Sequence, residues 1–190
     1  MRLICIILAS FHFVAGCASG APPLPTRLEL APGVSFTLPV RPPFDTDMNA
    51  VQLVRGNFGG RSERFQTIVE ATSSRFAIAM AVPSGPHIVT IEWHEGAIVV
   101  RRGIAPENLP IQRLLVDFML VYASDEAIHN ALVGAHLVSS GSGARRIFRN
   151  GKLLVEVVRP ATSPWEGSSR IHNHVHGYEL VIDSHTVKSE

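Results

Sequence analysis

The chain has few cysteines and little net charge, and each shortage excludes a class of protein. Cys5 and Cys17 are the only cysteines among 190 residues, so a scaffold held together by several disulfides is excluded. The formal net charge is +1 and charged residues make up 17% of the chain, which leaves no strongly basic face for nucleic acid. We therefore expect no nucleic-acid partner.

Hydrophobic residues, in contrast, make up 46% of the chain, which is enough for the core of one domain of this length. The 15 glycines have no regular spacing, so a collagen-like repeat is excluded as well. We expect a globular domain over residues 44–190 that is stabilised by packing.

The first residues have the layout of a secretory signal. Arg2 precedes a mostly apolar run from Leu3 to Val14, and small residues then lead to Cys17. The run is short for a membrane span, and the sequence Val14–Cys17 resembles the lipobox of bacterial lipoproteins. That resemblance implies a signal peptide at residues 1–16 and a diacylglycerol thioether on Cys17. An ordinary secretory signal or a short membrane helix are the alternatives.

The lipobox resemblance also implies a membrane partner and a location. Two or three acyl chains on Cys17 would attach the chain to a lipid bilayer in an effectively permanent way. Cys5 would leave with the signal, so no free thiol would remain for catalysis. Ala18 stands where an aspartate is the usual signal for retention in the inner membrane. The resemblance therefore implies lipid anchoring at the periplasmic face of the outer membrane.

Prolines are concentrated before the domain. Seven of the thirteen lie between Pro22 and Pro43, and this spacing forbids a continuous helix and favours extended backbone. We interpret residues 17–43 as a lipidated N-terminus and a proline-rich tether, of which residues 34–40 are a candidate edge strand.

The rest of the chain predicts strands with one helical interruption. Alternating patterns predict strands on both sides of residues 108–132, and Asn150-Gly151 is typical of a tight hairpin turn. Apolar residues from Ile111 to Tyr122 recur at helical spacing, with Asn108 as the expected cap. Ser124 is expected to cap a second, short helix. The fold class is therefore α+β and mainly β, with a curled antiparallel sheet whose concave face is covered by two mid-chain helices.

This order of elements resembles a family of bacterial lipoproteins of unknown function, often encoded near aryl polyene biosynthesis genes. The resemblance lies in residues 108–111, the following helix, the hairpin at Asn150-Gly151 and the terminal residues 177–182. The family is similar to LolB, the outer-membrane receptor that accepts lipoproteins from the periplasmic carrier LolA. The resemblance implies a LolB-like half-barrel that holds acyl chains, with an acyl lipid or lipoprotein as ligand and a periplasmic carrier protein as partner. The loop at residues 83–87 lacks the exposed leucine that LolB carries there.

Apolar residues in excess of an ordinary stripe are the candidates for a hydrophobic ligand. Adaptable methionine and aromatic side chains suit either irregular packing or a lipid cavity. The sequence leaves both readings open: a protein that binds or transfers lipids, lipoproteins or polyene-like products, and a structural or scaffolding lipoprotein without a cavity. The candidates are Phe76, Ile78, Met80, Val82, Leu114, Leu115, Phe118, Met119 and Tyr122.

Evidence for an enzyme is weak. The run from His172 to His176 places three imidazoles two residues apart, which on a strand could share a zinc ion if Glu179 completed the set. Gly177 is expected to bend the run, so we favour a polar face or loop. The glycine and serine residues at 139–143 lack the lysine of a phosphate-binding loop, and no nucleophile elbow occurs. We expect no catalytic residues, no metal and no cofactor.

Overall fold

The computed structural model describes residues 25–44 and 47–187, and its fold is α+β and mainly β, as expected from the sequence. Its helices are α1 (Ile111–Tyr122) and α2 (Asp125–Ala131). Its strands are β1 (Arg27–Ala31), β2 (Val34–Thr37), β3 (Met48–Phe58), β4 (Arg61–Ala71), β5 (Arg75–Ala81), β6 (His87–His94), β7 (Ala97–Arg102), β8 (Leu132–Val133), β9 (His136–Ser139), β10 (Ala144–Arg149), β11 (Lys152–Val158), β12 (Gly167–Asn173) and β13 (Tyr178–Thr186).

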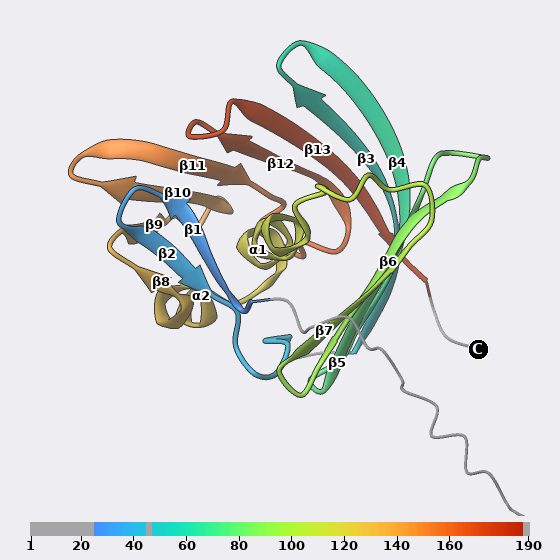
Figure 1. Ribbon diagram of the computed structural model, residues 1–190. Helices are drawn as coiled ribbons and strands as arrows, with labels where there is room; N and C mark the ends of the chain where they lie inside the picture. The colour runs from blue at the N-terminus through green and yellow to red at the C-terminus, as the bar shows by residue number, and fades with distance from the viewer. Residues whose placement is uncertain (1–24, 45–46, 188–190) are drawn as a thin grey trace, which may run out of the picture.

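Ten of these strands form one antiparallel sheet that curls around α1. Its order is β7-β6-β5-β4-β3-β13-β12-β11-β10-β9, so β13 joins the two halves of the chain by pairing with β3. This pairing runs from Tyr178 opposite Phe58 to Thr186 opposite Ala50. Figure 1 looks along α1 and shows the strands curving around it. The predicted curled antiparallel sheet is confirmed.

Residues with period-two alternation form strands with one covered face. On β4, Thr67 and Val69 are buried toward α1, whereas Gln66 and Glu70 are exposed on the outer face. Burial of alternate side chains fixes the register, since a slip by one residue would turn the whole apolar set outward. The alternation in β4 is as predicted from the sequence.

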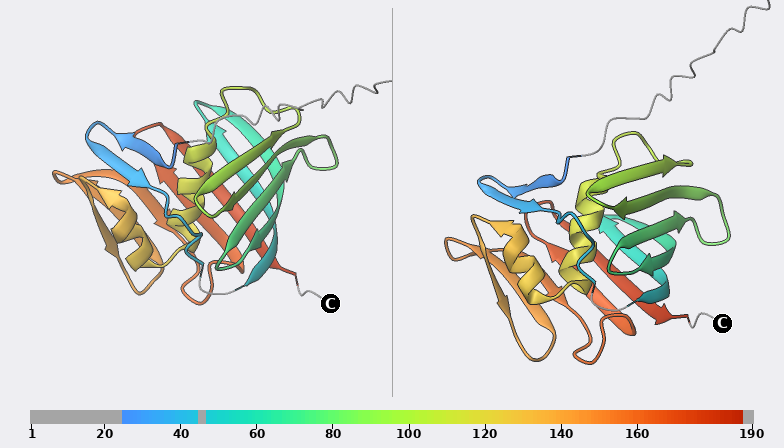
Figure 2. Two further views of the ribbon diagram at one scale, coloured as in Figure 1. Left: turned by 60° about the horizontal axis from the view of Figure 1, so that its bottom comes forward. Right: turned by 90° about the horizontal axis from the view of Figure 1, so that it is seen from below.

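The segment interpreted as a tether with one candidate edge strand contributes to the core. The strands β1, β2 and β8 form a second, three-stranded sheet, in which β2 pairs with both β1 and β8. Leu30, Val34 and Phe36 are buried, so the apolar side chains of this hairpin pack into the core although Pro32 stands in its turn. Both views in Figure 2 place the hairpin beside α1 and α2. The tether interpretation is therefore wrong for residues 27–31, and the strand expected within residues 34–40 is present as β2 but lies between β1 and β8 instead of at an edge.

The helix α1 is covered on all sides. Every residue from Leu115 to Tyr122 is buried, which is why its sequence is apolar around most of its circumference. Asn108 does not cap it. The helix begins after Pro110, and no side chain caps its first turn.

Two arginines hold the C-terminal end of α1. The guanidinium of Arg145 donates to the carbonyl oxygens of Leu120 at 2.8 Å and Ala123 at 2.7 Å, and it forms an ion pair with Asp125 at 2.6 Å. Arg159 donates to the carbonyl oxygen of Val121 at 3.1 Å. Cations at this end complement the helix dipole and satisfy carbonyl groups that lack partners within the helix.

The short helix α2 follows as predicted. The Ser124 hydroxyl accepts a hydrogen bond from the amide of Ala127, and Asp125 and Glu126 lie in the first turn. Its Ile128 is buried, and the helix lies beside β9 (Figure 1). Within the described residues, no helix has the length and hydropathy needed to cross a membrane.

Candidate functional site

A small apolar cavity lies between α1 and the concave face of the sheet. Its volume is about 50 Å³, and it lies against side chains of β3 to β6, α1 and β13. The lining residues are Gln52, Val54, Thr67, Phe76, Ile78, Met80, Ile91, Leu114, Leu115, Asp117, Phe118, Leu180 and Ile182. This cavity is the candidate site.

Six of the nine residues predicted to contact a hydrophobic ligand line this cavity. They come from two elements, β5 and α1, which the fold brings face to face. Alternation on β5 turns Ile78 and Met80 inward, and helical spacing on α1 turns Leu115 and Phe118 toward them. Ile78 and Leu114 are only partly buried, so they stand at the open side of the cavity. The six are Phe76, Ile78, Met80, Leu114, Leu115 and Phe118.

The other predicted residues lie elsewhere. Met119 and Tyr122 are buried on α1 but do not line the cavity. Val82 follows the end of β5, and 37% of its surface is exposed, because the strand ends at Ala81 and the chain turns. Cys17 lies outside the described residues. Val82 therefore lies outside the cavity.

Aromatic rings fill the space next to the cavity. Phe118 on α1 packs between Phe76 and Tyr122, with ring centroids 4.5 Å and 4.4 Å away. Trp165 lies 4.3 Å from Tyr122, and Phe44 contacts Phe76, Phe118 and Trp165. Such clusters contribute more than their buried area alone. Around this end of α1 the interior is packed.

A buried polar network fixes α1 to the sheet. The side-chain amide of Gln52 donates to the hydroxyls of Tyr122 at 2.8 Å and Ser184 at 3.0 Å, and its oxygen accepts from Thr67 at 3.0 Å. Tyr122 and Ser184 are also 2.7 Å apart. Burial raises the pKa of Tyr122 to about 12, so the phenol stays neutral. The network joins β3, β4, β13 and α1, and a fully connected network of this kind specifies one packing.

Asp117 places a carboxyl group at the edge of the cavity. Its Oδ2 accepts a hydrogen bond from the Tyr178 hydroxyl at 2.6 Å, and that hydroxyl accepts from the amide of Asn173 at 3.2 Å. Burial raises the pKa of Asp117 to about 7, against the opposing effects of Tyr178 and Arg113. Burial and the nearby Asp117 carboxylate also raise the pKa of Tyr178. The Asp117 carboxyl group therefore keeps its proton to a higher pH than an exposed aspartate does.

The histidine run does not form one face. The rings of His172 and His174 stack with centroids 4.0 Å apart, while Nε2 of His176 lies 3.3 Å from the carbonyl oxygen of Leu30. The run leaves the strand at Asn173, as the glycine that follows it suggested. Across residues 25–44 and 47–187, no group of three or more histidine, cysteine, aspartate or glutamate side chains could hold a metal ion.

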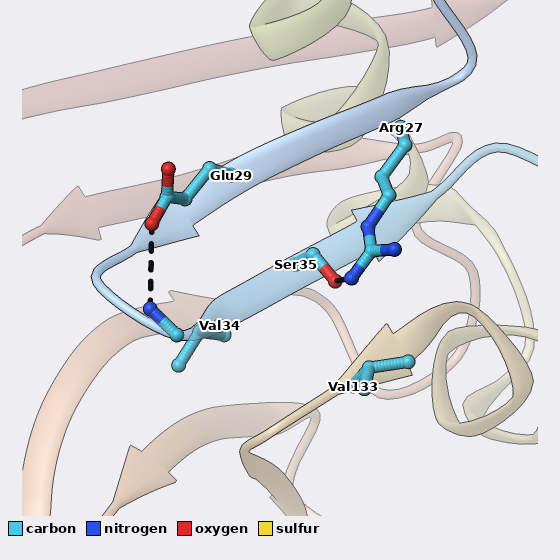
Figure 3. Close-up of a pocket in the computed structure, with 6 residues that line it drawn as sticks. Arg27, Glu29, Val34, Ser35 and Val133 are labelled. Carbon is cyan, nitrogen blue, oxygen red and sulfur yellow. Dashed lines mark hydrogen bonds between the residues drawn. The ribbon is translucent and has the colours of Figure 1, made fainter.

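Hollows on the surface are larger than the interior cavity. In one of them, the polar side chains already form hydrogen bonds within the protein. This hollow lies beside β1 and β2 and has a volume of about 370 Å³. Figure 3 shows the residues that line it. There Arg27 donates to the Ser35 hydroxyl at 2.8 Å, and Glu29 accepts from the amide of Gly33 at 3.3 Å. Val133 of β8 completes the lining. Because Arg27 and Glu29 already have hydrogen-bond partners within the protein, we do not choose this hollow as the candidate site.

The polar residues of the cavity are not apparent from the sequence pattern. Gln52 and Thr67 alternate into the concave face like apolar residues, and Asp117 interrupts the apolar run of α1. The one available signal was that Asp117 stands inside a stretch that is otherwise apolar from Leu114 to Val121. The rest of the lining is apolar, so Gln52, Thr67 and Asp117 give the cavity one edge that can form hydrogen bonds. Such a site can hold part of an apolar chain, and nothing in it resembles a nucleophile with its base.

Comparison with known proteins gives a family and no characterised relative. No curated protein sequence matches the chain significantly. Residues 49–186, which run from β3 to the last residue of β13, match a family described as protein of unknown function, DUF3261. The matched region contains every residue that lines the cavity and most of the described chain. The chain therefore belongs to the DUF3261 family.

Proposed function

We propose that this protein is a lipid-anchored periplasmic protein of the outer membrane that binds or transfers an acyl lipid, a lipoprotein or a polyene-like product, without catalysing a reaction. The observation that supports this proposal is the apolar cavity between α1 and the concave sheet. It has the position and lining that an acyl-chain site would need. In this proposal the bilayer is contacted through acylated Cys17, and a periplasmic carrier protein delivers or receives the ligand.

The proposal requires α1 or its flanking loop to move. A volume of about 50 Å³ is well below the roughly 150 Å³ that accommodates benzene in a protein interior. The C-terminal half of α1 is fixed by Arg145 and by Tyr122, whereas Arg113 and Leu114 near its start are only partly buried. We propose that the ligand enters beside Leu114 and enlarges the cavity by displacing the first turns of α1.

The similarity to LolB is part of this proposal in a limited form. The loop after β5 has no leucine, but Val82 is exposed there, and Ser84 adopts a positive φ of 54° in the turn. An exposed apolar side chain on a short loop is suited to a brief contact with membrane or carrier. We therefore propose lipid binding as the core activity and delivery to the membrane as its use.

A second candidate is a structural lipoprotein whose interior is only a core. The small volume of the cavity and the aromatic packing around Phe118 favour this candidate. The two candidates differ in one measurable property. In a filled core, a larger side chain lowers the free energy of unfolding by about 1–3 kcal/mol. In a ligand site, the larger side chain occupies the space of the ligand, so ligand binding is lost while stability is kept.

The test compares two tryptophan substitutions on neighbouring strands. Ile78→Trp places the ring at the open side of the cavity, and Ile68→Trp places it on the outer face of β4, where Ile68 is 60% exposed. The full chain and both variants are purified in detergent. Bound acyl lipid is then measured by native mass spectrometry, and stability is measured by thermal unfolding.

Lipid binding predicts that the wild type and Ile68→Trp retain equal amounts of acyl lipid. Ile78→Trp then retains at least several-fold less while its unfolding temperature stays close to that of the wild type. If the wild type is free of lipid and Ile78→Trp unfolds at a clearly lower temperature, the interior is a core and the structural candidate holds. Equal lipid on all three proteins would place the lipid outside this cavity and contradict the proposal.

A further inference from the structure

A second hollow lies where three hairpin turns meet. The β1–β2, β10–β11 and β12–β13 turns lie near one another at one side of the molecule, on the left in Figure 1. Between them lies a hollow of about 450 Å³ that is open to solvent. Its lining residues are Ala31, Pro32, Arg149, Asn150, Lys152, Leu154, His174 and Val175.

Hydrogen bonds between the turns make this hollow a fixed part of the fold. The amide of His174 donates to the carbonyl oxygen of Leu154 at 2.9 Å, which ties the β12–β13 turn to β11. His176 contacts the carbonyl oxygen of Leu30, which ties the same turn to β1. Within the turn, the side chain of Asn173 accepts bonds from two amides. The walls therefore keep their spacing without a ligand.

The polar side chains of the hollow carry positive charge or donate hydrogen bonds. Arg149 and Lys152 flank the Asn150-Gly151 turn, and His174 faces the hollow from the next hairpin. The lining includes no carboxylate. The carboxylate of β1, Glu29, lies at the neighbouring hollow, where it accepts a bond from the amide of Gly33. A concave surface with this charge attracts an anion.

The guanidinium of Arg149 lies close to Gly33. A Cβ atom at Gly33 would lie only 2.6 Å from Nη2 of Arg149, so the guanidinium rests directly on the glycine backbone. Other exposed arginines form ion pairs: Arg146 with Glu156 at 2.6 Å and Arg170 with Glu179 at 3.3 Å. No ion pair to Arg149 or Lys152 occurs within residues 25–44 and 47–187.

We propose that this hollow binds a phosphate group carried by a small molecule or lipid. A phosphate presents several oxygens in different directions, which suits donors that come from the β10–β11 and β12–β13 turns, and the planar fork of arginine recognises it well. The floor formed by Leu154 and Val175 is apolar and accommodates the carbon atoms next to the phosphate. A phospholipid headgroup and a soluble phosphate ester share this chemistry. The site shares no residue with the interior cavity, so its test is separate from the test of the proposed function.

The test measures phosphate binding by the full chain in detergent at pH 7 with isothermal titration calorimetry. The probes are inorganic phosphate, glycerol 3-phosphate, dihexanoylphosphatidylglycerol below its micelle concentration, and acetate. The variant Arg149→Ala with Lys152→Ala removes two cations of the hollow. Its matched control, Arg61→Ala with Arg64→Ala, removes two exposed cations from β4 and changes the net charge equally.

We expect the wild type and the control to bind the phosphate probes with Kd values within twofold, and the hollow variant to bind at least about tenfold more weakly. Tighter binding of the phospholipid than of glycerol 3-phosphate assigns the site to lipid headgroups, and equal binding assigns it to soluble phosphate esters. Both results support the phosphate site. Equal affinity for acetate, equal losses in both double variants, an unchanged Kd in the hollow variant, or no binding up to about 10 mM phosphate would each overturn it.

Discussion

Tyr178 donates a hydrogen bond of 2.6 Å to the carboxyl group of Asp117, and this pair joins β13 to the middle of α1. Both residues are buried among side chains that are mainly apolar. Burial destabilises the ionised carboxylate of Asp117 more than the hydrogen bond from Tyr178 stabilises it. The pKa of Asp117 therefore rises. A charge that is costly in the folded protein makes folding depend on pH.

The contribution of Asp117 to the stability of the protein should therefore fall as pH rises from about 4 to 7. The pKa of Asp117 is raised from 3.8 to about 7, so in this range the folded protein holds a proton that the unfolded chain has released. Stability from a raised pKa is fully present below the unfolded value and is lost as pH rises through the folded value. The loss amounts to at most about 4 kcal/mol, at 1.36 kcal/mol per pKa unit.

The variant Asp117→Asn isolates this effect, since it keeps an acceptor for Tyr178 and cannot ionise. We expect it to be close to the wild type at pH 4 and more stable than the wild type at pH 8, in urea unfolding followed by circular dichroism. A difference between the two proteins that stays constant from pH 4 to 8 would show that the carboxyl group does not titrate in this range.

Local features of the fold were readable from the sequence. The hairpin at Asn150-Gly151 was predicted because both turn residues adopt positive φ easily, and they do so at 49° and 73°. The helix from Ile111 to Tyr122 followed from its apolar spacing, and the Ser124 cap followed from the acidic residues after it. Each of these features depends on residues within about one turn of each other.

Features that depend on distant residues were missed. The pairing of β13 with β3 joins residues more than 100 positions apart, and no local pattern specifies it. The network around Gln52 could not be predicted either, because its members look like ordinary polar residues until β3, β4, β13 and α1 are assembled. For the same reason the volume of the cavity and its polar edge at Asp117 could not be predicted.

Removing Arg145 should destabilise the protein far more than removing its neighbour. Arg145 is 3% exposed and satisfies carbonyl groups at the end of α1, whereas Arg146 is an exposed residue that forms an ion pair with Glu156. We expect Arg145→Ala to lower the free energy of unfolding by about 3 kcal/mol, because charged hydrogen bonds in a buried site are lost. Arg146→Ala should cost less than about 1 kcal/mol. Similar losses in urea unfolding would mean that Arg145 does not hold the helix.

Two glycines with similar backbone angles should tolerate alanine differently. Gly134 and Gly151 have φ values of 82° and 73°, so alanine is strained at both, at about 1 kcal/mol. At Gly151 a Cβ atom meets nothing within 4 Å, whereas at Gly134 it collides with the carbonyl oxygen of Gly33. Gly134→Ala must therefore push β2 and β8 apart. We expect it to cost about 2 kcal/mol more than Gly151→Ala in thermal or urea unfolding, and equal costs would contradict the tight approach of these strands.

The proposed lipid anchor can be tested with the two cysteines of the chain, both of which lie outside the described residues. If Cys17 is the acylated residue, Cys17→Ser removes the only thiol that the lipobox positions for modification. Cells that express this variant should incorporate no labelled palmitate into the protein, and the protein should no longer be found as an acylated species in the membrane fraction. Cys5→Ser is the matched control, since Cys5 lies in the proposed signal and should be removed with it, so that labelling and membrane attachment persist. Label that remains on Cys17→Ser, or that disappears equally from both variants, would contradict acylation at Cys17 and with it the anchored form of the proposed function.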